Sequence, residues 1–126
     1  MTDIGCIYAA LDPAHDEIMP GGEEHEPLFE SLPVPAHAWL AFEGSALSER
    51  FHAIEHGGLI GSYEECWFKA PALPKLAALI DAELASAPAA ARVWLADVAR
   101  FARRAHGRGV GLTFMIGGET DLRANS

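Results

Sequence analysis

Residues 88–116 read PAAARVWLADVARFARRAHGRGVGLTFMI, and this stretch holds the two clearest structural signals in a chain of 126 residues. Pro88 suits the first turn of a helix, and Gly107 is placed to end it. Between them, a single apolar stripe predicts a helix with one buried face. Four side chains align within roughly 60° on a helical wheel: Trp94, Val98, Phe101 and Ala105.

The second signal follows directly, at residues 110–116. Apolar and small or polar side chains alternate there, which predicts a strand with one face toward the core. The apolar positions are Val110, Leu112, Phe114 and Ile116. The glycine-rich turn before it runs helix, glycines, strand, which is the reverse of a phosphate-binding loop.

The rest of the chain extends this pattern. Strands are predicted at residues 3–11, 36–42 and 59–69, the second as a central strand covered on both faces. A helix of about three turns is expected from an N-cap at Ser45 to Gly57-Gly58. Another is predicted by the stripe at Leu73, Leu76, Ala77, Ile80 and Leu84.

The expected fold is therefore α+β, in the order strand, long loop, strand, helix, strand, helix, helix, strand. We predict a single domain over residues 1–118, with about four strands in one sheet and three helices mainly on one face. Residues 119–126 are predicted to be a polar tail. The pattern leaves mixed or antiparallel pairing open.

Composition sets further bounds. Apolar residues make up 50% of the chain, which favours a globular protein. No basic leader precedes an apolar run at the N-terminus, and no window approaches about 18 apolar residues, so we expect no signal peptide and no membrane span. Cys6 and Cys66 are too few for a disulfide framework, and reduced thiols indicate a cytoplasmic protein.

Charge is distributed unevenly. The first 49 residues contain ten acids and no Lys or Arg, a formal charge of −10, while all nine basic residues and eight acids follow. The whole chain carries −9. Such a field attracts cationic surfaces and repels nucleic-acid phosphate, so nucleic acid is not an expected partner.

Many of these acids lie at residues 12–35, here called the acidic segment, together with five of the eight prolines. So long a loop is unusual within a compact domain, which suggests a functional segment. Leu28, Phe29 and Leu32 could form one helical turn that attaches it to the core. The clusters at residues 15–17 and 23–26 combine histidine with carboxylates, but their spacing matches no calcium loop.

Residues 52–56 match the His-x-x-Glu-His zinc motif. Two histidines four residues apart share a helix face, and the adjacent Glu55 could act as a general base. The stripe of Leu47, Phe51 and Ile54, however, turns His52 and His56 away from the core. Exposed surface histidines are therefore the preferred interpretation.

Cys66 is disfavoured as a nucleophile, because the acids Glu64 and Glu65 beside it would raise its pKa. Those two acids point to opposite faces of a strand, so they cannot act together on one substrate atom.

These observations favour a small acidic protein-binding module over an enzyme, with no cofactor and no metal. The most concrete version of this hypothesis is an inhibitor or immunity-type protein that covers a basic partner, such as a toxin or nuclease. Its expected contact residues are Asp16, Glu17, Glu23, Glu24, Glu26, Glu30, Trp39 and Trp67.

Two alternatives stay open. The first is a small metal-binding protein or hydrolase that uses His52, Glu55 and His56 or the His/Glu-rich loop. The second is a structural subunit whose acidic segment closes a homodimer or a heterocomplex. Internal pairing competes with the leading hypothesis: if the arginines of the last helix meet the acidic segment, they would mute its exposed negative field.

Overall fold

Four antiparallel strands form one sheet in the order β2-β1-β4-β3. The strands are β1 (Asp3–Ala10), β2 (Phe29–Pro35), β3 (Glu65–Phe68) and β4 (Leu112–Ile116). This is a computed structural model, and it describes residues 3–16, 26–43, 45–52, 54 and 65–116. The α+β class predicted from the sequence is confirmed.

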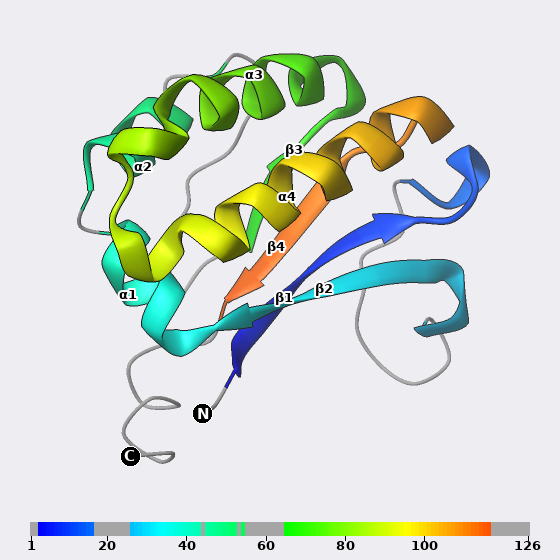
Figure 1. Ribbon diagram of the computed structural model, residues 1–126. Coiled ribbons are helices and arrows are strands. Elements are labelled where there is room, and N and C mark those ends of the chain that lie inside the picture. The colour runs from blue at the N-terminus through cyan, green and yellow to red at the C-terminus, as the bar shows by residue number, and fades with distance from the viewer. Residues whose placement is uncertain (1–2, 17–25, 44, 53, 55–64, 117–126) are drawn as a thin grey trace.

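Within these residues, four α-helices accompany the sheet, one more than the three predicted: α1 (Ala36–Glu43), α2 (Ala46–His52), α3 (Leu73–Glu83) and α4 (Ala89–Arg108). Helices α3 and α4 run side by side over one face of the sheet, and α1 and α2 lie toward one end (Figure 1). No helix within the described ranges has the length and apolarity needed to cross a membrane.

The core lies between the helices and the sheet. Ile7 of β1 pairs with Phe114 of β4, and both side chains are fully buried. A chain of aromatic contacts, with ring centroids 4.8–6.2 Å apart, connects β3 and β4 to three helices. Edge-to-face contacts of this kind hold the layers in one arrangement. The rings belong to Trp39, Phe42, Phe51, Phe68, Trp94 and Phe114.

The strand predicted at residues 36–42 is wrong, because this segment is helix α1. A continuous apolar run does not distinguish a buried strand from a buried helix. The burial pattern shows which one formed: Ala38, Trp39 and Phe42 are buried, whereas His37 and Leu40 are exposed. That spacing is helical, with one face toward the core.

The second strand instead occupies residues 29–35, within the segment predicted as a loop with a helical turn. The helical turn predicted at Leu28, Phe29 and Leu32 is wrong, because Phe29 and Leu32 lie in β2; a 3₁₀ helix, η2 (Glu26–Leu28), precedes the strand. Pro33 and Pro35 indicated a loop, since proline cannot donate a ladder hydrogen bond. β2 is an edge strand, however, and an edge strand tolerates proline where the N–H would face solvent.

Helix α2 begins as expected and is described for two turns. The Ser45 hydroxyl accepts a hydrogen bond from the Ser48 N–H at 3.4 Å, so the predicted N-cap is confirmed. Leu47 and Phe51 of its stripe are buried. The predicted continuation to Gly57-Gly58 and the first part of the predicted strand at 59–69 lie outside the described residues.

Helix α4 continues past Gly107, the residue predicted to end it, and terminates at Gly109. Gly109 adopts the left-handed conformation, with φ of 77°. Its N–H bonds to the carbonyl of His106 at 2.9 Å, and the N–H of Val110 bonds to that of Ala105 at 3.0 Å. These two bonds are those of a Schellman motif, which needs the positive φ at one residue only.

Replacement of Gly109 by alanine is expected to lower the free energy of unfolding by about 1 kcal/mol, because a Cβ is disfavoured at positive φ. The matched variant Gly107→Ala should leave stability unchanged or raise it by up to about 1 kcal/mol, because Gly107 is helical and a Cβ there meets nothing within 4 Å. Urea unfolding followed by circular dichroism measures both. Equal destabilisation by the two substitutions would contradict this account of the helix end.

Candidate functional site

The acidic segment is held to the domain at its upstream end by Asp16. Its carboxylate oxygen Oδ1 accepts a hydrogen bond of 2.8 Å from the N–H of Gly111, between α4 and β4. Nearby, the N–H of Leu11 bonds to the carbonyl of Leu28 at 2.9 Å and joins the two sides of the segment. A partly buried hydrogen bond to a carboxylate is among the stronger local contacts in proteins.

Glu30 holds the downstream end. It lies on β2, and its Oε2 is 2.9 Å from Nη2 of Arg104 on α4. Its Oε1 is buried and accepts no hydrogen bond, so the 3.1 Å contact with Nη1 of Arg108 is an ion pair alone. Arg108 also donates from Nε to the carbonyl of Ala10 at 3.2 Å. The C-terminal turns of α4 thus connect to both β1 and β2.

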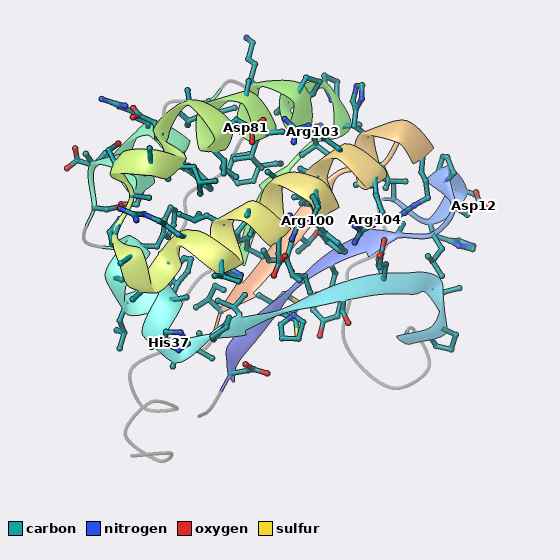
Figure 2. All side chains as sticks on the ribbon, viewed as in Figure 1. Asp12, His37, Asp81, Arg100, Arg103 and Arg104 are labelled. Carbon is teal, nitrogen blue, oxygen red and sulfur yellow. The ribbon has the colours of Figure 1, made fainter. Side chains whose placement is uncertain are left out.

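The other arginines of the described residues also have partners within the chain. Figure 2 shows Arg103 near Asp81 in the space between α4 and α3, whereas Arg104 lies toward the strands. Arg92 donates to the carbonyls of Ala87 and Ala85, each at 3.0 Å. The remaining ion pairs are Arg50 with Glu83 and Arg100 with Asp97.

These contacts give Asp16 and Glu30 structural roles within the domain, although sequence reasoning expected them to bind a partner. Glu26 lies in η2. Trp67 lies on β3, where its backbone is paired with Thr113 of β4, and its side chain is outside what the structure describes. The expected contacts Glu17, Glu23 and Glu24 fall outside the described residues altogether.

Trp39 is not an exposed anchor, and that expectation is corrected. Its side chain has 0% exposure and packs against Phe42 and Trp94, at centroid distances of 5.4 and 6.2 Å. The sequence already indicated that Trp39 is buried, because the residues next to it are apolar. Once the segment folds as a helix, Trp39 points into the core and its ring is inaccessible to a partner.

The zinc motif cannot be assembled from described side chains. His52 ends α2, and Glu55 and His56 lie outside the described ranges. Elsewhere in the described part of the chain, no three His, Cys, Asp or Glu side chains lie close enough together to hold a metal ion.

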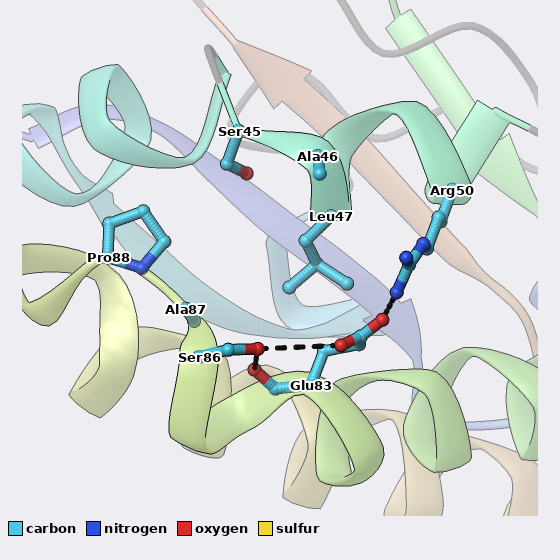
Figure 3. Close-up of a pocket in the computed structure, with 8 residues that line it drawn as sticks. All are labelled: Ser45, Ala46, Leu47, Arg50, Glu83, Ser86, Ala87 and Pro88. Atoms are coloured by element: carbon cyan, nitrogen blue, oxygen red, sulfur yellow. Dashed lines mark hydrogen bonds and ion pairs between the residues drawn. The ribbon is translucent and has the colours of Figure 1, made fainter.

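A small hollow of about 250 Å³ separates α2 from the end of α3 and the 3₁₀ helix η4 (Leu84–Ser86). Figure 3 shows Arg50 and Glu83 facing each other across it, with Ser86 beside Glu83. The two charges of this hollow are already matched to each other. It therefore offers no net charge to a ligand, and sequence reasoning did not anticipate it.

A second hollow, of about 330 Å³, lies where β2, α1 and α4 meet. Its walls are mainly apolar, with His37 and Asp97 as the ionisable side chains. It was also missed from the sequence, because residues 29–43 were assigned to the wrong elements.

Comparison with protein families, with curated proteins and with solved structures finds no match for this chain. The function must therefore be inferred from its own charges and geometry.

Substitution of Glu30 by glutamine is expected to lower the free energy of unfolding by about 1–2 kcal/mol, because it leaves the half-buried Arg108 without its counter-charge. Asp81→Asn is the matched control, since it neutralises an exposed acid that pairs with another arginine of α4. Its expected cost is below about 0.5 kcal/mol. Thermal and urea unfolding compare the two, and an equal cost would contradict a special role for Glu30.

Proposed function

We propose that this protein is a small acidic protein-binding module that docks onto a basic protein. The form we favour is an inhibitor or immunity-type protein, which would cover a cationic surface such as the active site of a toxin or nuclease. Carboxylates can take the places that phosphates occupy on such a surface.

The observation that carries this proposal is the engagement of every arginine in the described residues with the chain itself. The cationic face that the sequence of α4 suggests is therefore already occupied by intramolecular partners. A net charge of −9 remains over the whole chain. This combination disfavours a phosphate-binding surface and supports a cationic partner.

The internal pairing is also selective. The described arginine pairs use four acids: Glu30 comes from the first 49 residues, and Asp81, Glu83 and Asp97 come from α3 and α4. Asp3 and Glu49 are exposed. Most of the described ion pairs of these arginines thus use acids from outside the acidic third of the chain, which supports an outward negative potential.

The anchors at Asp16 and Glu30 bear on the proposal in another way. They attach the flanks of residues 17–25 to the end of the sheet where α4 terminates. In the sequence, Glu17, Glu23 and Glu24 thus lie between two residues that are attached to the domain. We propose these three acids as the charges that meet the partner, together with Glu26 and Trp67.

A partner bound in this way should be retained by the immobilised chain at about 50 mM NaCl and released at about 500 mM, because salt screens charges separated by more than a few ångströms. Mass spectrometry identifies the retained protein, which we expect to be basic. With that protein purified, its association rate should fall about tenfold over the same range of salt.

The double variant Glu23→Gln/Glu24→Gln should slow association about threefold, since charges near an interface act mainly on the encounter rate. Glu119→Gln/Asp121→Asn removes the same number of charges elsewhere in the chain and serves as the control. Equal effects of the two variants would contradict a specific acidic surface. Stoichiometric metal in the purified protein, lost on His25→Ala or His52→Ala, would instead support the metal-binding alternative.

A further inference from the structure

The groove of about 330 Å³ between β2, α1 and α4 is largely apolar and has a polar edge. Leu32, Pro33 and Pro35 of β2 form one wall, and Val93 and Trp94 of α4 form the other. Its volume is near the lower end of the range of about 300–1,000 Å³ for ligand pockets. It suits one or two side chains more than a large cofactor.

Large apolar side chains are exposed beside this groove. Val93 is 78% exposed, the highest value for a large apolar side chain among the described residues. Leu40 is 54% exposed and follows the groove residue His37 by three positions on α1. Residues three apart on a helix share a side, so Leu40 extends the apolar surface from the groove. A recess with an apolar rim favours insertion of a side chain from another protein.

The edge strand determines how a partner can bind here. Pro33 and Pro35 have no N–H, so this stretch of β2 cannot pair fully with an added strand. Recognition therefore has to come from a side chain that enters the groove, and not from continuation of the sheet.

Charge indicates the chemistry of that partner. The ionisable side chains that line the groove are His37 and Asp97, with neither Lys nor Arg among them, and Asp97 contributes a partly exposed carboxylate. Asp97 pairs with Arg100 one turn later, but Arg100 does not line the groove and the Asp97 side chain is 39% exposed, so a second cation can reach the carboxylate from the groove. Together with the net charge of −9, this favours a cationic residue beside the inserted apolar one.

We propose that the groove receives a leucine-sized side chain from an extended basic segment of the partner, with an adjacent Lys or Arg placed over Asp97. This inference rests on the proposed function, because it assumes a basic protein partner. It adds an apolar anchor on a surface formed by β2, α1 and α4, separate from the acidic segment at the other end of α4.

The test is a titration of the ¹⁵N-labelled chain with three short peptides, followed by NMR. The probes are acetyl-Lys-Leu-Lys-Lys-amide, its Leu→Ala counterpart, and acetyl-Glu-Leu-Glu-Glu-amide. The first should shift the amide signals of Ala90, Val93 and Asp97 and the indole N–H of Trp94. The alanine peptide should bind about tenfold more weakly, since it loses most of the buried apolar area. The acidic peptide should leave these signals unchanged.

Val93→Lys is the test variant, because this exposed position tolerates a polar side chain and the new cation would repel the basic probe. Leu11→Lys is the matched control, since Leu11 is also exposed, at 51%, but does not line the groove. We expect the first variant to weaken binding of the leucine peptide about tenfold and the second to leave it unchanged.

The outcomes separate the two proposals. If the shifted signals lie outside the groove and neither Leu→Ala nor Val93→Lys changes binding, the groove proposal is overturned. The proposed acidic binding surface is then unaffected. Equal binding of the acidic and basic peptides in the groove would overturn the cationic partner, and with it the proposed function. No shift from any peptide would overturn the groove, while the salt-dependent capture would still decide the proposed function independently.

Discussion

Burial of one face of α4 is the interaction on which the rest of this structure depends. Eight of its twenty residues are buried, among them Trp94, Val98 and Phe101. The buried alanines between these larger side chains leave room for α3 to lie alongside (Figure 1). Because removal of apolar surface from water is the main favourable term in folding, this helix sets the position of the sheet, of α3 and of the arginines on its other side.

Those arginines have a different meaning in the folded chain than in the sequence. In the sequence they form a basic helix face, whereas in the structure each finds a carboxylate or a backbone carbonyl of the same chain. The ion pairs that Glu30 forms with Arg104 and Arg108 are the informative ones, because they join α4 to the acidic first third of the chain. Internal neutralisation therefore occurs at the base of the acidic segment, and the proposed binding surface consists of the acids beyond it.

Sequence reasoning succeeded where one periodicity dominated and failed where two structures share the same signal. Helices α3 and α4 and strands β1 and β4 fall close to the predicted ranges, because an apolar stripe or an alternating pattern defines each of them. Residues 29–43 were assigned to a loop and a strand but form a strand and a helix. The prolines of the edge strand indicated a loop, and the unbroken apolar run of the helix indicated a strand. The groove beside Val93 was missed for the same reason, since its walls come from these elements.

The sequence by itself determined the α+β class, the buried faces of the long helices, the cap at Ser45 and the excess of negative charge, because these follow from local spacing and composition. Only the tertiary structure decided which charges remain available and which aromatic rings are accessible. Asp16, Glu30 and Trp39 were plausible contacts in the sequence, yet folding brings each to a partner distant in the chain. Ion pairing and burial depend on distances between elements, and such distances exist only after the apolar faces have packed.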